Sequence, residues 1–290
     1  MKKIAAFTGS ILMVALALAG CSKKGPEAKG AKGDKKVITV GYAQVGAESD
    51  WRTANTESMK STFSEDNGYE LIFDDAQQKQ ENQLTAIRNF IQQEVDYIVL
   101  APVTETGWDT VLQEAKDAGI PVIIVDRMVD VSDDSLYTAW VGSNFKLEGQ
   151  KAMAWLDAYL EAKGRGDEEI NLVDIQGTIG ASAQIGRTEG FDEAVEAHDN
   201  WTTLAQQSGE FTQAKGQEVM ESILKQSGDD IDVVYCENDN EAFGAIDAIE
   251  AAGYKVGGEE GQILVMSFDT TNAGLTDTLS GKITLDTECN

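Results

Sequence analysis

Charged and amide side chains follow most of the long apolar runs of this sequence, directly after the last aliphatic residue. The run at residues 120–125 shows this most clearly, because Asp126 and Arg127 come straight after it. An apolar run of this kind is typical of a strand that is buried on both faces of a parallel sheet. Other candidate side chains in the segments that follow such runs are Glu48, Trp51, Arg52, Arg187, Asn238 and Asp269.

These residue types could bind an uncharged polyol. Carboxylates accept hydrogen bonds, guanidinium groups donate them in a rigid fork, and amides do both, which suits adjacent hydroxyl groups. The indole of Trp51 offers a flat apolar surface to the C–H face of a sugar ring. Neighbouring acids and bases also keep such a site near neutral, whereas a phosphate site would show a glycine-rich turn and an excess of positive charge.

Each of these residues also has a simpler explanation when it is taken alone. A single aspartate after a strand, such as Asp126 or Asp269, caps a following helix about as often as it binds a ligand. Arg127 and Arg187 could form ordinary surface ion pairs. Their shared position favours a site, because the carboxyl ends of parallel strands meet at one edge of a sheet. The tryptophans that we assign to packing are Trp108, Trp140, Trp155 and Trp201.

Strand-like and helix-like segments alternate along the chain from residue 37 to residue 268. Helical periodicity is clear at Leu84, Ile87 and Ile91, which would share one face of a helix. The predicted strands lie at residues 37–42, 69–73, 97–100, 122–125, 136–141, 170–175, 203–206, 232–236 and 263–268. The predicted helices lie at residues 53–66, 80–93, 108–118, 147–162, 183–197, 212–226 and 241–252. Repeated strand–helix units indicate parallel sheets that are covered by helices on both faces.

The order of these segments predicts an α/β fold with two similar, Rossmann-like lobes. Four strands, a connecting strand and four further strands place the lobe boundary near Gly142 and Ser143. The first lobe would then span residues 37–142 and the second residues 143–288, with residues 289–290 starting a return crossing. Because no linker rich in proline or glycine separates the lobes, we expect a hinged cleft between them.

The beginning of the sequence has the features of an export signal. Lys2 and Lys3 precede a short apolar run at residues 11–19, and the residues up to Cys21 resemble a lipobox, the site at which bacterial lipoproteins are cut and diacylated. The run is too short for a membrane span, which needs roughly 20 apolar residues. Residues 22–36 carry six lysines and two acids, which predicts a flexible tether that suits an anionic membrane surface. We expect an exported protein whose residues 1–21 end at a lipidated Cys21.

Charge and composition exclude several classes of function. Residues 37–290 carry 15 lysines and arginines against 48 acids, so nucleic acid is not an expected partner. The single histidine, His198, lies in a charged stretch that we expect to be solvated, which argues against triad and histidine-rich metal sites. Nucleophile-elbow, Walker and dinucleotide motifs are missing, and no cofactor or metal is expected. Cys236 and Cys289 are expected to be unpaired, partly buried thiols.

The order and spacing of seven segments resemble the periplasmic solute-binding proteins of sugar ABC transporters, in the ribose-binding class and its galactofuranose-binding group. These segments are QVGAESDWR (44–52), QQKQENQ (77–83), APVTETGW (101–108), IPVIIVDR (120–127), DIQGTIGAS (174–182), QSGEFTQAKGQEVMES (207–222) and ENDNEAFGAI (237–246). They spread over nearly all of residues 37–290. The resemblance implies the type I periplasmic binding protein fold.

The resemblance also implies roles for individual residues. Trp51 would stack on a sugar ring and Phe211 would close the other side, while Arg52 donates to a hydroxyl group. Asn290, in the last segment, would supply one further polar contact. The remaining residues that the resemblance places in the site are Asp126 and Arg127 from the first lobe, and Arg187, Asn238 and Asp269 from the second.

The expected function is therefore the capture of a monosaccharide, galactofuranose or another aldose such as arabinose or ribose, by a monomer that delivers it to an ABC-type permease. A sugar sensor that reports to a chemoreceptor or a histidine kinase would use the same site. A glycoside hydrolase could be imagined with Asp126 and Asp269 as its pair of carboxyl groups. Members of the family continue beyond the position of Asn290, so the sequence resembles a C-terminally truncated member with an open sheet edge.

Overall fold

The computed structural model describes residues 37–289. The signal peptide that ends at Cys21, the tether at residues 22–36 and the candidate ligand residue Asn290 lie outside the described residues. Among the helices of residues 37–289, none combines the length and the apolar character that crossing a membrane would require.

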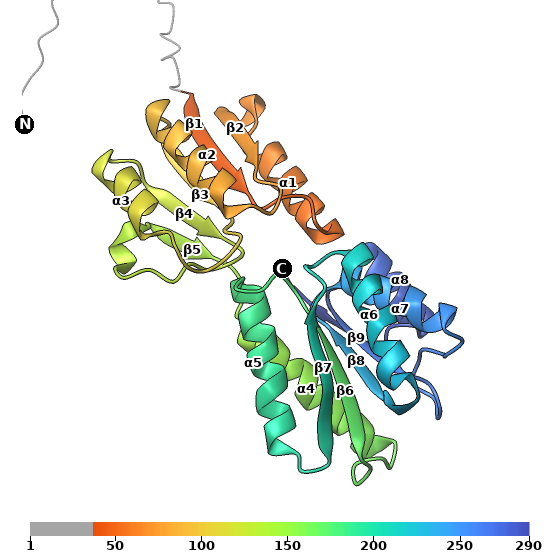
Figure 1. Cartoon of the computed structure of the whole chain (residues 1–290). Helices are drawn as coiled ribbons and strands as arrows, with labels where there is room; N and C mark the ends of the chain where they lie inside the picture. The colour runs from red at the N-terminus through yellow and green to blue at the C-terminus, as the bar shows by residue number, and fades with distance from the viewer. Residues whose placement is uncertain (1–36, 290) are drawn as a thin grey trace, which may run out of the picture. The chain divides into compact units, whose positions relative to one another are not determined.

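The first half of the described chain forms a parallel sheet whose strand order is β2-β1-β3-β4-β5 (Figure 1). Its strands are β1 (Ile38–Gln44), β2 (Tyr69–Asp75), β3 (Tyr97–Leu100), β4 (Val122–Val125) and β5 (Ala139–Val141). Its helices are α1 (Asp50–Thr62), α2 (Gln80–Gln92) and α3 (Asp109–Asp117). Helix α1 packs on one face of the sheet, and α2 and α3 pack on the other, so side chains such as Ile98 and Ile124 are fully buried.

The second half forms another parallel sheet, with strand order β10-β9-β8-β6-β7. Its strands are β6 (Ile170–Gln176), β7 (Trp201–Ser208), β8 (Val233–Cys236), β9 (Leu264–Asp269) and β10 (Leu285–Glu288). Its helices are α4 (Phe145–Ala162), α5 (Ser182–Ala197), α6 (Gln213–Ser227), α7 (Asp239–Ala251) and α8 (Asn272–Ser280). One core lies between the sheet and α4 and α5, and a second core lies between the sheet and α6 and α7.

Two parallel sheets with helices on both faces agree with the predicted α/β architecture. The first sheet ends at Val141 and α4 begins at Phe145, so the predicted lobe boundary falls in the segment between them. Strand β5 is shorter than predicted, and it is not a connector, because it pairs with β4 along the edge of the first sheet. Strand β10 and helix α8 were not predicted. The sequence LDTE of β10 contains two acids, a composition that is unusual in strands.

The start of α1 also differs from the prediction, since the helix begins at Asp50 rather than at residue 53. The side-chain oxygen of Ser49 accepts a hydrogen bond from the backbone N–H of Arg52 and so caps the helix. This cap brings Trp51 and Arg52 into the first turn, where they face the carboxyl end of β1. The Asn55 side chain then accepts hydrogen bonds from Tyr42 and Gln44 of β1, which fixes the helix on the strand.

Most of the packing predictions for the aromatic residues and cysteines are confirmed, with two corrections. Trp108 and Trp201 are buried, and Trp155 stacks on Tyr159, but Trp140 is 37% exposed. His198 is half-buried rather than solvated, because its ring stacks on that of Trp201 at a centroid distance of 3.9 Å. The cysteines at 236 and 289 are unpaired, as predicted, and both are buried.

Helices α4 and α5 approach each other closely because glycines face each other across the contact. A Cβ atom on Gly190 of α5 would lie 2.5 Å from the backbone nitrogen of Gln150 and 2.6 Å from the carbonyl carbon of Gly149, both in α4. Backbone atoms cannot move aside as the end of a flexible side chain can. The close contact is relevant to function because α5 carries Arg187 and α4 carries the side chains that surround it.

We predict that Gly190→Ala lowers the free energy of unfolding by about 1–3 kcal/mol, the usual cost of overpacking a core. The clash must outweigh a gain of about 1 kcal/mol in helix propensity. Glu196→Ala, at an exposed position of the same helix, is the control and should change stability by less than about 0.5 kcal/mol. Urea unfolding followed by circular dichroism measures both, and a stabilised Gly190→Ala variant would contradict the tight contact.

Candidate ligand-binding site

Nine of the ten ligand-binding residues predicted from the sequence line a single pocket between the carboxyl ends of the two sheets. The cavity volume is about 30 Å³, far below the roughly 300–1,000 Å³ of small-molecule sites, so entry of a ligand requires the lining or the lobes to move apart. The predicted residues in its lining are Glu48, Trp51, Arg52, Asp126, Arg127, Arg187, Phe211, Asn238 and Asp269. The remaining predicted residue, Asn290, lies outside the described residues.

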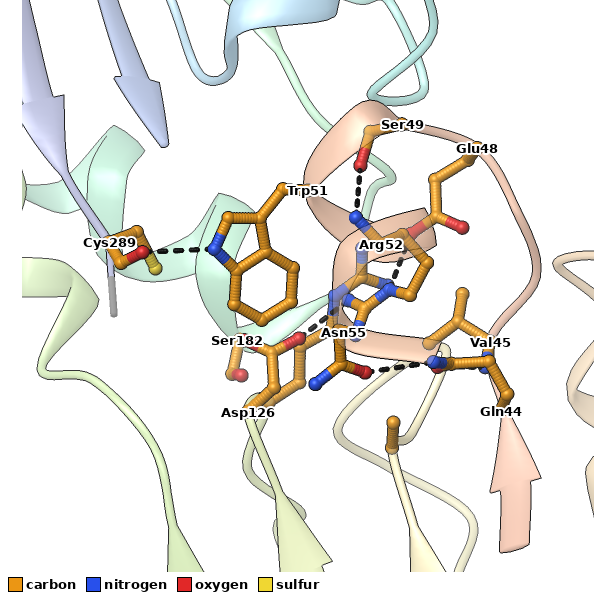
Figure 2. A network of polar contacts seen from close by, with 12 residues as sticks. Gln44, Val45, Glu48, Ser49, Trp51, Arg52, Asn55, Asp126, Ser182 and Cys289 are labelled. Atoms are coloured by element: carbon orange, nitrogen blue, oxygen red, sulfur yellow. Dashed lines mark hydrogen bonds and ion pairs between the residues drawn. The ribbon is translucent and has the colours of Figure 1, made fainter. Parts of the chain in front are cut away.

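Two buried arginines of the first lobe share Glu48 as a partner on one side of the pocket. Figure 2 shows Arg52 with its partners Glu48 and Asp126. Arg52 donates from Nε to Glu48 Oε1 at 3.0 Å and from Nη2 to Asp126 Oδ2 at 2.5 Å. Arg127 donates from Nη2 to the same Glu48 oxygen at 3.4 Å and from Nη1 to the Val103 carbonyl at 3.2 Å. Both arginines are only 3% exposed, so these ion pairs are not the surface pairs of the simpler explanation.

The two guanidinium groups differ in how well their charge is compensated. Burial lowers the pKa of Arg127 to about 10, and the nearby positive charge of Arg52 adds to the effect. Burial acts on Arg52 in the same direction, but Asp126 and Glu48 outweigh it and raise the pKa of Arg52. The Nη1 atom of Arg52 is buried and has no hydrogen-bond partner in the protein. A ligand oxygen could therefore accept a hydrogen bond from Arg52 Nη1.

Arg187 of helix α5, in the second lobe, is held from several directions. Its Nε and Nη2 atoms donate to Glu148 Oε2 at 3.2 and 3.0 Å, and Nη1 donates to the Glu237 carbonyl. Nη2 also lies 3.6 Å from Asp269 Oδ1. The guanidinium carbon sits 5.3 Å from the ring centroid of Phe145 and 4.6 Å from that of Phe268. With this many partners, the side chain is preorganised before any ligand arrives.

The pKa values around Arg187 reflect this environment. Burial alone would lower the pKa of Arg187, but neighbouring negative groups, above all Glu148, raise it. Burial raises the pKa of Asp269 well above the usual carboxyl value, although Arg187 lies beside it. The Asp269 carboxyl is therefore poorly solvated, and hydrogen bonds with a ligand would stabilise it.

Two aromatic rings reach the pocket from different lobes. The indole Nε1 of Trp51 donates to the Cys289 carbonyl at 2.9 Å, which ties α1 to the segment after β10. The ring of Phe211 lies 4.9 Å from the guanidinium carbon of Arg127, so it forms a cation–π contact across the pocket. Phe211 reaches this position because a Cβ atom on Gly177 would overlap its ring, and only glycine leaves the space.

Asn238 has both of the roles that were considered for residues at strand ends. Its Oδ1 accepts from the Glu241 backbone N–H at 2.8 Å and caps α7, and its Nδ2 donates to the Phe211 carbonyl at 3.1 Å. One amide hydrogen of the side chain remains for a ligand. Asp126 and Asp269 are not helix caps, since the helix that follows Asp269 is capped by Thr271.

Backbone strain coincides with the pocket. Asp126, Phe211 and Asp269 have φ values of 61°, 59° and 105°, in the left-handed region that residues with a Cβ atom avoid. Strained residues of this kind persist only where the surrounding structure holds them, and they cluster at functional sites. Three strained residues in one pocket support a binding role that no single residue would establish.

Sequence reasoning missed several residues of the site. Phe145 and Ala183 line the pocket from the first turns of α4 and α5, and Cys289 lines it from the segment after β10. Glu148, the main partner of Arg187, also belongs to α4. The search covered the loops and helix starts that directly follow predicted strands, and Phe145 and Glu148 lie on α4, which follows the segment between the lobes. Their spacing, three residues apart at the start of a helix, was an available signal.

The rims of the two lobes are joined by direct hydrogen bonds around the pocket. The Asp50 backbone N–H donates to Asn240 Oδ1 at 3.0 Å on one side. On the other side, the Glu105 N–H donates to the Gly180 carbonyl at 2.8 Å, and the Met128 N–H donates to Ser182 Oγ at 2.8 Å. Within residues 37–289, no group of histidine, cysteine and acidic side chains has the arrangement of a metal site.

We predict that Arg52→Met lowers the free energy of unfolding by about 3–5 kcal/mol, because it leaves the Asp126 side chain buried without its ion pair and leaves Glu48 with only the longer contact to Arg127. Arg88→Met is the matched control, since Arg88 pairs with Glu114 at an exposed position and its loss should lower stability far less. Chemical unfolding of the ligand-free chain checks both variants. Equal losses in the two would show that the buried cluster contributes no more than a surface pair.

Comparison with known proteins gives a consistent result. Residues 40–286 match a family whose description is periplasmic binding protein domain. The galactofuranose-binding protein YtfQ of Escherichia coli is 48% identical over 222 residues, which cover 76% of this chain and 68% of that protein. A structure from Mycobacterium smegmatis in complex with β-D-fucofuranose matches with a TM-score of 0.82 and 45% identity, over 87% of this chain and 81% of that one. A galactofuranose-binding protein matches with a TM-score of 0.79 and 44% identity, over 85% and 81% of the two chains.

Proposed function

The chain belongs to the periplasmic binding protein family, and from this premise we propose that it captures one monosaccharide in furanose form between its lobes and delivers it to an ABC-type permease. Galactofuranose or a closely related aldose is the proposed ligand. The relatives in the comparison are binding proteins rather than enzymes, as the sequence predicts for this chain.

The composition of the pocket lining is the observation that carries the proposal. Three arginines and three acids line the pocket, so the site is balanced in charge and suits a neutral ligand with many hydroxyl groups. Trp51 and Phe211 add aromatic surface from the two lobes. A phosphorylated or strongly anionic sugar would meet Asp126, Asp269 and Glu48 without a matching excess of positive charge.

The names of the relatives favour a furanose ring. The relative from Escherichia coli is named for galactofuranose, and the related structure from Mycobacterium smegmatis is a complex with β-D-fucofuranose. These two sugars share the furanose ring form. A second relative of solved structure is also named for galactofuranose.

The proposed mechanism couples binding to closure of the lobes. Arg52 and Asp126 would engage hydroxyl groups from the first lobe, and Asn238 and Asp269 would engage others from the second. A ligand that contacts both lobes stabilises the closed arrangement, because an open arrangement offers only half of these contacts. The permease would then recognise the closed form, which holds the rims together at Asn240 and Ser182.

The location of the protein follows from its family, whose members act outside the cytoplasm. Attachment to the membrane through a lipid on Cys21 and a monomeric state are further parts of the proposal. Delivery to a permease can be separated from sensing by measuring uptake of labelled sugar in cells with and without the gene.

We predict that calorimetric titration of the chain with D-galactose, D-fucose, L-arabinose and D-ribose detects binding of at least one sugar. A separate fluorescence titration with that sugar should show a change in the emission of Trp51, which lines the pocket. Asp126→Asn and Asp269→Asn should each weaken that binding by about 1.5–3 kcal/mol, the range for hydrogen bonds that involve charged groups.

The control for these variants is Asp109→Asn, which removes a half-buried carboxylate from the first turn of α3, outside the pocket, and should leave the affinity unchanged. Unchanged affinity in both site variants, in folded protein, would reject the proposed contacts. Failure of every sugar to bind would reject the proposed ligand class.

A further inference from the structure

Two carboxyl groups face each other beneath the loop that carries Asp269. Asp239 lies in the first turn of α7, and Asp286 lies in β10. A Cβ atom on Gly274 of α8 would contact the Oδ2 atoms of both, so the two oxygens point toward the same small space. Two buried carboxylates that point into the same space repel each other when both are charged, so this arrangement favours a state in which one of the two groups carries a proton.

The hydrogen bonds around the pair indicate which group carries the proton. Asp239 accepts three donors, from Ser267 Oγ at 2.6 Å, the Thr271 N–H at 2.8 Å and Thr271 Oγ1 at 2.7 Å, and these stabilise its anion. Asp286 accepts only from Thr270, through Oδ1 at 3.1 and 3.3 Å. Its Oδ2 is buried, accepts no hydrogen bond and points toward the same space as the Asp239 carboxyl. The shared proton therefore belongs to Asp286.

Neither aspartate forms an ion pair within the part of the chain that the structure describes; the neighbouring cation Arg187 lies beside Asp269 instead. The titratable groups on the elements around the pair include Cys236 at the end of β8, Glu241, Asp247 and Glu250 in α7, Asp269 at the end of β9, Asp277 in α8 and Glu288 in β10. Helix α8 approaches the pair with its backbone at Gly274. Burial, followed by the charge of Asp239, raises the pKa of Asp286 to about 7.

The pair also holds a strained loop. Asp269 and Thr270 have φ values of 105° and 56°, and all four hydrogen bonds from the N–H and hydroxyl groups of Thr270 and Thr271 end on the two aspartates. The same loop directs the Asp269 carboxyl toward Arg187, at 3.6 Å. The position of Asp269 in the pocket therefore depends on the two aspartates staying together.

We propose that Asp239 and Asp286 are positioning residues that share one proton and thereby hold Asp269 in the ligand site, so that ligand affinity falls when this proton is lost. The inference rests on the proposed function, because Asp269 acts here as a ligand residue. Loss of the proton places two buried anions side by side, and their repulsion separates β10 from the first turn of α7.

The sign of the pH dependence follows from the direction of the shift. Asp286 titrates at higher pH in the folded chain than in the unfolded chain, so its contribution is complete at low pH and is lost as the pH rises through about 7. Because linkage is reciprocal, ligand binding near neutral pH should be accompanied by proton uptake. Loss of affinity with rising pH would not result from titration of the arginines, which lose their protons only in a more alkaline range.

The test is calorimetric titration of the full chain between pH 6.0 and pH 8.5 with the tightest binder among D-galactose, D-fucose and L-arabinose. The wild-type Kd should rise roughly tenfold over this range, which corresponds to a shift of one pKa unit. Asp286→Asn should keep the same Kd at every pH, because an amide donates permanently to Asp239 and still accepts from Thr270. Glu288→Gln, at an exposed position of the same strand, should keep the wild-type profile.

Two further readouts make the result decisive. Titrations of the wild type at pH 7 in buffers of different ionisation enthalpy should show proton uptake, and zero uptake would overturn the proposal even if Asp286→Asn fails to fold. Unfolding without sugar should lose stability between pH 6.0 and pH 8.5 in the wild type and not in Asp286→Asn. Identical profiles in the two would overturn the shared proton, whereas a flat Kd beside this stability difference would overturn its link to the site. Absence of sugar binding at every pH would reject the proposed function separately.

Discussion

Buried guanidinium charge is the constraint on which the site depends. Arg52, Arg127 and Arg187 are almost fully removed from solvent, and each therefore needs acidic or carbonyl partners within hydrogen-bond distance. The partners bring together chain segments that are far apart in sequence, since Asp126 reaches Arg52 across 74 residues and Glu148 reaches Arg187 across 39. Satisfying these charges also produces a lining of balanced charge, which is the property that suits a neutral ligand. Stability and specificity thus have a common physical origin in this pocket.

The scaffold keeps these groups in place by close contacts and by strain. Facing glycines let α4 and α5 touch, so that Arg187 is enclosed by side chains of both its own helix pair and β9. The left-handed backbone at Asp126 and Asp269 turns two carboxyl groups into the pocket at the ends of β4 and β9. At Asp269, hydrogen bonds from the following loop to Asp239 and Asp286 hold the strained backbone. The protonation of Asp286 therefore affects the position of Asp269 in the site.

The sequence predicted much of the fold and of the site because both follow local rules. Apolar runs gave most strands, and the residues directly after them, such as Asp126 and Asp269, do lie at one pocket. The rule failed for residues outside the segments that follow predicted strands and for residues whose position depends on tertiary pairing. Glu148 lies on α4, and Asp286 belongs to a polar edge strand whose partner residue Asp239 is 47 positions away. Neither burial nor a shared proton can be read from such spacing, because both arise only when the elements pack.

The most direct test of the central claim is a crystal structure of the chain with its tightest-binding monosaccharide. The account predicts one sugar ring between Trp51 and Phe211, with hydroxyl groups within hydrogen-bond distance of Arg52 Nη1 and of Asp269. A sugar found elsewhere on the protein, with the guanidinium and carboxyl groups of this pocket paired only to each other, would contradict it.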